Sequence, residues 1–206
     1  MADYFALLNE PRRPWIDPEV LKAAFVALTS KVHPDRVHSL SAVERDNAHR
    51  RFTDLNTGYS CLRDPRKRLA HLLELELDRK PENVREIPAG IVGLFEKVGA
   101  AGRQADAFLS DKGRIVSPLL KVRLLEQADA LTDRIQSILR ELNAGHELLV
   151  LQLKGLNETW ASAPPVGSAE RRAVLPCDRL EQVYHEVSYL TRWIQQMQER
   201  LTRLAI

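Results

Sequence analysis

The stretch LKAAFVALTSKVHPDRVHSLSAVERDNAHRRFTDL, residues 21–55, places a proline-containing tripeptide between two amphipathic segments. Before the tripeptide His33-Pro34-Asp35, apolar residues recur in steps of four, three and four, which is the spacing of one stripe along an α-helix. These residues are Leu21, Phe25, Leu28 and Val32. Because a proline disfavours helical geometry at the residue before it, we expect this helix to end at the tripeptide.

A second helix is predicted to follow the tripeptide. Ser41 and Glu44 have the spacing of a capping box, in which two side chains satisfy free backbone N–H groups at a helix start. Apolar residues then recur in steps of four and three through residues 42–62: Ala48, Phe52, Leu55, Tyr59 and Leu62. Since the two stripes match, we expect the two helices to pack as an antiparallel hairpin.

Cap signals frame this hairpin on both sides. Asp17-Pro18 combines a preferred N-cap residue with a proline suited to the first helical position, and Asp64-Pro65 repeats the pattern. Residues 3–8 form a further short amphipathic segment. The first eighty residues are therefore predicted to be a helical hairpin flanked by a short helix and a trailing helix.

The second half of the chain is also predicted to be helical. Residues 79–87 are polar and contain a proline, so we divide the chain into a domain at 1–78, a linker at 79–87 and a helical bundle at 88–206. We expect a turn at residues 110–113 and a loop over residues 162–176, which contain three prolines. If the long helix between them bends or breaks, we expect this near residues 143–145.

The last helix has the clearest repeat, with apolar residues in alternating steps of three and four. They are Leu180, Val183, Val187, Leu190, Ile194, Met197, Leu201 and Leu204. Three helices with such stripes close one core, which favours a three-helix bundle. Self-association through this stripe as a coiled coil is the competing interpretation, so a monomer or a weak homodimer is expected.

Composition narrows the class of protein. The chain has 206 residues, 44% hydrophobic and 28% charged, and a formal charge of +2, which gives a nucleic-acid role no support. Cys61 and Cys177 lie far apart without a C-x-x-C motif, so we expect two buried thiols and no metal or other cofactor. With no run of eighteen apolar residues and no signal peptide at the start, a cytoplasmic protein without a membrane anchor is expected.

Three further runs surround the tripeptide: Tyr4-Phe5-x-Leu7-Leu8, Asn56-x-x-Tyr59-x-x-Leu62 and Asp64-Pro65-x-x-Arg68. Together with the helical hairpin, they resemble the J-domain family. This resemblance implies a co-chaperone that stimulates a DnaK-type ATPase through His33, Pro34 and Asp35, with Lys22, Lys31 and Arg36 as further contacts. No nucleophile–base pair is visible, so we expect docking and no enzyme activity. The alternative is a simple helix–helix turn in a coiled-coil adaptor.

One feature departs from that family. J-domains carry several basic residues on the outer face of the helix before the tripeptide. Here the face opposite the apolar stripe holds Glu19, Ala23, Val26 and Ser30. The charge expected to steer an acidic chaperone surface is therefore reduced.

The run Asn157-Glu158-Thr159-Trp160-x-x-Ala163 narrows the resemblance to HscB, the J-protein of iron–sulfur cluster assembly. That resemblance implies an HscA-like DnaK-type partner and an IscU-like scaffold protein as client. It assigns client binding to Ile91, Val92, Phe95, Glu96 and Tyr189. Helical geometry independently predicts that Tyr189 is exposed, because it lies about 160° from the local apolar stripe.

The acidic positions expected after Glu96 are occupied by Gly99 and Ala100, with Arg103 further on. A J-protein that serves a different client is therefore the alternative function.

Overall fold

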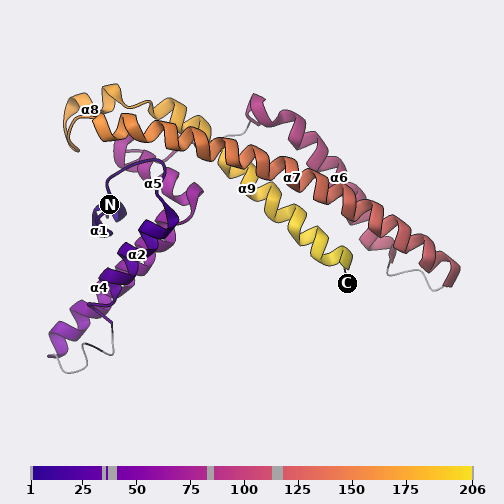
Figure 1. Ribbon diagram of the computed structural model, residues 1–206, viewed down its shortest axis with the longest axis horizontal. Helices are drawn as coiled ribbons and strands as arrows, with labels where there is room; N and C mark the ends of the chain where they lie inside the picture. Colours follow the sequence, from indigo (N-terminus) through magenta and orange to yellow (C-terminus); the bar gives the residue numbers. More distant parts are fainter. Residues whose placement is uncertain (1, 34–35, 37–40, 83–85, 113–117, 206) are drawn as a thin grey trace. The chain divides into compact units, whose positions relative to one another are not determined.

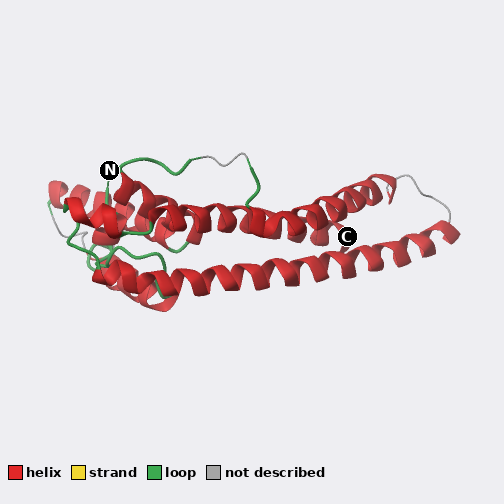
Figure 2. Ribbon diagram, turned by 90° about the horizontal axis from the view of Figure 1, so that it is seen from above, coloured by secondary structure: helices red, strands yellow, loops and turns green. Residues whose placement is uncertain are grey.

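The computed structural model describes residues 2–33, 36, 41–82, 86–112 and 118–205. Figure 2 shows helices and connecting loops, and the described residues contain no strand, so the predicted all-α class is confirmed for them. The helices, labelled in Figure 1 except for the short 3₁₀ turn η1, are α1 (Tyr4–Leu7), α2 (Pro18–Thr29), α4 (Ala42–Leu62), α5 (Pro65–Leu77), η1 (Ala89–Ile91), α6 (Val92–Lys112), α7 (Pro118–Ser162), α8 (Ala169–Val174) and α9 (Cys177–Ala205).

The predicted caps start three of these helices. The Asp17 carboxylate accepts hydrogen bonds from the backbone N–H groups of Glu19 and Val20, at 2.9 and 3.2 Å. Ser41 and the residue three positions later form the complete capping box of α4. Asp64 accepts from the N–H of the residue at N3 of α5, at 3.0 Å. Each cap satisfies backbone donors that a helix start leaves free, and each stabilises its helix by about 1 kcal/mol.

The predicted hairpin is confirmed by the packing of α2 against α4, which lie side by side in Figure 1. The Phe25 ring stacks on Tyr59 with centroids 4.2 Å apart and an interplanar angle of 14°. Leu21 and Leu55 are buried on the facing stripes. Burying one such leucine contributes roughly 2 kcal/mol, so the stripes hold the two helices together.

The helix before the tripeptide ends earlier than the proline predicts. α2 stops at Thr29, and the chain continues in tight turns in which the Lys31 and Val32 N–H groups donate to carbonyls three residues back. The Thr29 hydroxyl donates to the Phe25 carbonyl at 2.8 Å, a side-chain bond that competes with continuation of the helix.

α1 is held against α5 through a buried histidine. The Tyr4 N–H donates to Nε2 of His71 at 3.2 Å, and the Phe5 ring stacks on the imidazole at 5.9 Å. Burial lowers the pKa of His71, while the nearby carboxylates of Asp3 and Glu74 oppose that shift. Because Nε2 accepts a hydrogen bond, His71 is neutral in this arrangement.

Contacts divide the chain into two compact units. Unit 1 comprises Met1–Glu82 and Gln152–Tyr184, and unit 2 comprises Asn83–Leu151 and His185–Ile206. α7 and α9 therefore contribute a segment to each unit. The division into 1–78, 79–87 and 88–206 follows the chain and stays a prediction.

Within unit 1, α7 is joined to the segment before α2. The Trp15 N–H donates to Oδ1 of Asn157, and Nδ2 of Asn157 donates to the Trp15 carbonyl, both at 2.9 Å. Nζ of Lys154 lies 4.5 Å above the centre of the Trp15 indole ring, a cation–π contact. The Asn157 amide thus binds both backbone groups of Trp15 and ties α7 to the segment before α2.

Two sequence predictions about the second half are wrong, and the bend considered near residues 143–145 is not formed. α7 is continuous across residues 143–145, because Leu142 and Leu149 bury its apolar stripe on both sides of Gly145. α6 continues through residue 112, where a turn was expected from residue 110. The predicted loop at 162–176 contains α8, which Ser168 caps by accepting from the N–H of Arg171 at 3.3 Å.

α8 carries a buried arginine that pairs with α5. Nε and Nη2 of Arg171 each donate to Glu76 at 2.9 Å, and Nη1 donates to the Pro164 carbonyl at 2.8 Å. The two side chains are 7% and 4% exposed. The hydrogen bonds to Glu76 raise the pKa of Arg171, so the buried guanidinium stays charged.

Unit 2 is built from α6 and parts of α7 and α9. Its buried apolar residues lie on one stripe of each helix: Val98, Ala101, Ala105 and Phe108 on α6, Ile135, Ile138, Leu142 and Leu149 on α7, and Val187, Leu190, Trp193, Met197 and Leu204 on α9. This is the arrangement expected of helices that close one core.

The two cysteines differ in exposure. Cys177 is buried, as predicted, whereas Cys61 is only half-buried. Among the described residues, no helix has the length and apolarity needed to cross a bilayer, and no three His, Cys, Asp or Glu side chains gather as a metal site.

The neutral, buried state of His71 predicts a pH-dependent stability. Its pKa is lower in the folded chain than the ordinary value of 6.5, so the unfolded chain binds more protons as the pH falls through that range. The free energy of unfolding should therefore decrease between about pH 7.5 and about pH 5.5. Urea titration at both pH values should find a smaller decrease for His71→Gln, and an unchanged one for the exposed control His49→Gln.

The Arg171–Glu76 pair predicts a selective loss of stability. Arg171→Met leaves the buried Glu76 carboxylate without the guanidinium that binds it, which should lower the unfolding free energy by about 2–3 kcal/mol. The loss should fall at the low end of this range because Arg12, 3.8 Å from Glu76, still offers a positive charge. Urea titration should find little effect for the exposed neighbour Arg172→Met, and partial recovery on adding Glu76→Gln to Arg171→Met. Equal effects of the two arginine substitutions would contradict a structural role for the pair.

Candidate functional site

The first candidate site follows the C-terminal end of α2 and lies against α4. His33 is exposed, and its ring lies edge-on to Phe52 of α4, with centroids 6.0 Å apart and planes at 87°. The His33 carbonyl accepts a hydrogen bond from the Arg36 N–H at 2.9 Å. Pro34 and Asp35 lie outside the described residues.

The Phe25–Tyr59 stack supports this end of the hairpin. It lies one helical turn before the end of α2 at Thr29 and two turns after Phe52 on α4. The stack holds α2 against α4, and the chain after α2 places the His33 imidazole against Phe52 near the middle of α4.

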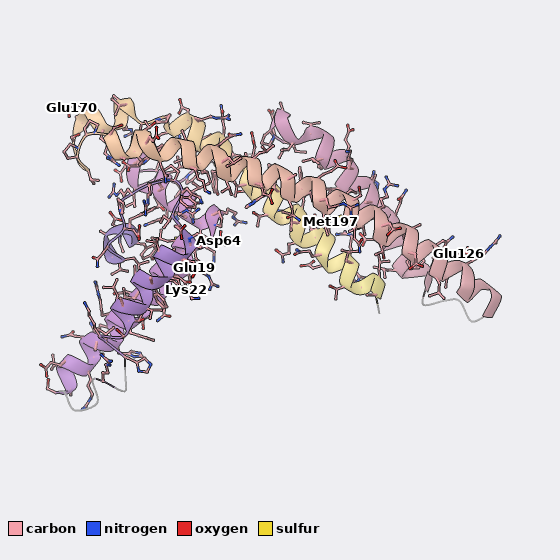
Figure 3. The ribbon with its side chains drawn as sticks, in the orientation of Figure 1. Glu19, Lys22, Asp64, Glu126, Glu170 and Met197 are labelled. Carbon is pink, nitrogen blue, oxygen red and sulfur yellow. The ribbon has the colours of Figure 1, made fainter. Side chains whose placement is uncertain are left out.

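The surface next to His33 has mixed character. Lys22, Lys31 and Arg36 are exposed cations, and Figure 3 labels Lys22 and the acidic Glu19 on α2. Val26 is exposed on the same helix, as the helical geometry predicted for the outer face. Within the described part of the chain, Lys22 and Lys31 form no ion pair. The surface around α2 and the segment after it thus presents a few cations near the exposed Val26.

The second candidate site lies in unit 2, at the start of α6. Val92 and Phe95 are 41% and 45% exposed, and the neighbouring Glu96 is exposed as well. Ile91 is only 5% exposed, so its side chain packs inside unit 2 and does not face solvent. Among the predicted residues of this helix segment, three are thus accessible and one supports them from beneath.

Tyr189 is half-buried, so the prediction of an exposed aromatic is wrong. Its ring lies 5.5 Å from that of Trp193, one helical turn further along α9, and the Arg192 guanidinium lies 6.0 Å from its centre. Trp193 in turn lies 6.1 Å from Phe95 of α6. The structure therefore brings Phe95 and Tyr189 together through a tryptophan that the sequence pattern did not single out.

The apolar repeat of α9 explains why Trp193 was missed. From Leu190 to Met197, steps of four and three pass through Ile194, whereas steps of three and four pass through Trp193. Both fit a helical stripe equally well. The structure buries Trp193 and leaves Ile194 half-buried, so the stripe follows the tryptophan.

A shallow groove of about 190 Å³ runs between α6 and α9 beside these aromatics. Its apolar part is formed by Phe95, Val98, Trp193 and Met197, of which Figure 3 labels Met197 on α9. The remaining lining residues are polar or lack a side chain: Gly99, Gly102, Arg103, Asp106, Gln196 and Arg200. A space of this size suits one or two apolar side chains of a larger partner.

Several curated proteins resemble the chain in sequence, although no family model matches it. A co-chaperone protein HscB homolog from Azoarcus sp. (strain BH72) is 44% identical over 73 residues, 35% of this chain and 41% of the relative. A homolog from Chromobacterium violaceum is 39% identical over 88 residues, or 42% of this chain. The chain thus spans about half or less of these two relatives, 41% and 50%.

A longer match is found in a homolog of the same name from Ralstonia nicotianae. It is 29% identical over 164 residues, which cover 79% of this chain and 84% of the relative.

Two solved structures have the same fold. Chaperone HscB from Vibrio cholerae superposes with a TM-score of 0.52 at 18% identity, covering 97% of this chain and 99% of the other. The human co-chaperone protein HscB gives a TM-score of 0.57 at 16% identity, covering 98% of this chain and 81% of the other. The predicted plan of an N-terminal J-domain and a C-terminal helical domain is therefore confirmed at the level of the fold. In both sequence and fold, this chain is HscB-like.

Proposed function

We propose that the chain is a co-chaperone that stimulates the ATPase of a DnaK-type chaperone and delivers an iron–sulfur scaffold protein to it. The observation that carries this proposal is the α2–α4 hairpin, in which the exposed His33 follows α2 and lies against Phe52 of α4. The names of the relatives, co-chaperone protein HscB homologs, support the same role.

The tripeptide acts as a docking element. His33 offers an imidazole that both donates and accepts hydrogen bonds near neutral pH. Asp35 supplies a carboxylate suited to an arginine fork on the chaperone, and Pro34 restricts the backbone between them. The chain contributes no catalytic group of its own, since the ATP and its hydrolysis belong to the chaperone.

The surface around α2 and the segment after it supplements this contact. Lys22, Lys31 and Arg36 supply positive charge that steers an acidic chaperone surface, and Val26 adds an apolar contact beside them. Few charges are involved, so we expect a smaller contribution of salt-sensitive steering than a fully basic helix would give.

The accessible residues of unit 2 hold the client. Val92, Phe95 and Glu96 line the start of α6, and Tyr189 reaches the same surface through Trp193. Ile91 supports this surface from the interior. A client held on the same chain as the J-domain is presented to the chaperone at a raised effective concentration.

An HscA-like chaperone and an IscU-like scaffold are the partners that this proposal names. A second candidate is a J-protein with a different client. Gly99 and Ala100 favour it, because they stand where acidic residues are expected in the HscB resemblance, and Arg103 further on is basic.

The docking role of the tripeptide predicts the loss of stimulation on replacing His33. Single-turnover ATP hydrolysis by a DnaK-type chaperone should be stimulated about tenfold less by His33→Gln than by the unchanged chain, as for an interface hot spot. His49→Gln, on an exposed position of α4, should stimulate normally. Normal stimulation by both variants would exclude the J-domain mechanism.

The client surface predicts a separable binding defect. Phe95→Ala should weaken binding of an IscU-like scaffold by about five- to thirtyfold, because it removes a half-exposed aromatic anchor. Calorimetry of scaffold binding checks this, with Leu148→Ala as control, because Leu148 is an exposed apolar residue of α7 outside this surface. Both variants should still stimulate the ATPase without client, and equal scaffold affinities for the two would remove Phe95 from the site.

A further inference from the structure

The groove between α6 and α9 contains one arginine whose charge is not neutralised within it. Arg103 is exposed, and within the described part of the chain it has no hydrogen bond or ion pair. Arg200, the other cation in the lining, is bound to Asp106 by Nε and Nη2, at 3.1 and 2.7 Å. Since that pair is neutral, the groove lining carries a net charge of +1 from Arg103.

The guanidinium groups of Arg103 and Arg200 each lie over a glycine of α6. A Cβ atom on Gly99 would be 3.4 Å from Nη1 of Arg103, and one on Gly102 would be 3.6 Å from the Arg200 guanidinium. Arg103 therefore folds back along α6, over the turn that precedes it. Its charge lies near the level of Gly99, one turn from Phe95.

We propose that the groove selects a client segment with an apolar side chain and an acidic side chain two residues away. The apolar side chain fits against Phe95, Trp193 and Met197, and the carboxylate pairs with Arg103. This proposal rests on the client-binding role proposed above and specifies the chemistry of the segment.

The spacing follows from helix and strand geometry. Gly99, over which the Arg103 guanidinium lies, is four residues after Phe95, about 6 Å along α6 at 1.5 Å per residue. An extended peptide rises about 3.3 Å per residue, so two residues cover that distance and place their side chains on the same face. A guanidinium without a partner also donates directed hydrogen bonds to a carboxylate. A lysine of the client could not accept these bonds, and its charge would be repelled.

The test uses three short synthetic peptides of one length, each with a single leucine in a glycine–serine background. The peptides differ only at the position two residues after the leucine, which is glutamate in the first peptide, glutamine in the second and lysine in the third. Their binding to the full chain is followed by NMR, through the indole resonance of Trp193, up to about 10 mM peptide because a single anchor gives weak binding.

The glutamate peptide should bind about threefold more tightly than the glutamine peptide at low salt, and the lysine peptide should bind most weakly. Added salt should reduce these differences. Arg103→Glu should reverse the order, a result that unfolding cannot produce, whereas Arg140→Glu on an exposed position of α7 should preserve it.

Equal binding of the three peptides, no binding of any, or an unchanged order with Arg103→Glu would each overturn the charge preference. The outcome is separate from the scaffold proposal. If Phe95→Ala releases the scaffold while the peptides show no order, the client role stands and the charge preference fails. If the peptides follow the order but no iron–sulfur scaffold binds, the groove's preference stands and its client is a different protein.

Discussion

The guanidinium of Arg68 is buried at 5% exposure, and it joins the end of α4 to the segment before α2 within unit 1. It donates to the carbonyl of Leu62 at the end of α4, at 2.7 Å, and to that of Pro14 before α2, at 3.0 Å. Burial lowers its pKa to about 10, so it is still charged near neutral pH. Because the next residue, Trp15, is clamped by Asn157 of α7, one run of hydrogen bonds links the hairpin to the C-terminal half of the chain.

The two candidate sites use aromatic contacts in different ways. In the hairpin, the Phe25–Tyr59 stack lies behind the site and fixes the helices that carry His33. In unit 2, the aromatic rings are part of the surface itself, and Trp193 connects Phe95 to its neighbour on α9. The first site thus depends on the rigidity of its support, whereas the second depends on the apolar area that it leaves accessible.

The sequence predicted those features that depend on local chemistry. Capping residues such as Asp17 and Asp64 marked helix starts correctly, because a cap is decided within three residues. It failed where tertiary contacts decide. The stripe of α9 fits Trp193 and Ile194 equally well, and only packing chooses between them. Likewise, no local pattern announces that Arg171, inside a proline-rich segment, has a carboxylate on α5 as its partner.

The pairing of Arg171 with Glu76 limits how the connection between α7 and α9 can change in related sequences. Surface connections usually accept insertions and deletions, because closing a slightly longer loop costs little. Here the Arg171 guanidinium donates both to Glu76 of α5 and to the Pro164 carbonyl, so its position is fixed. A single-residue deletion between Pro164 and α8 would turn the short helix by about 100° and withdraw the guanidinium from its partner. The length of this segment is therefore as constrained as the identity of Arg171.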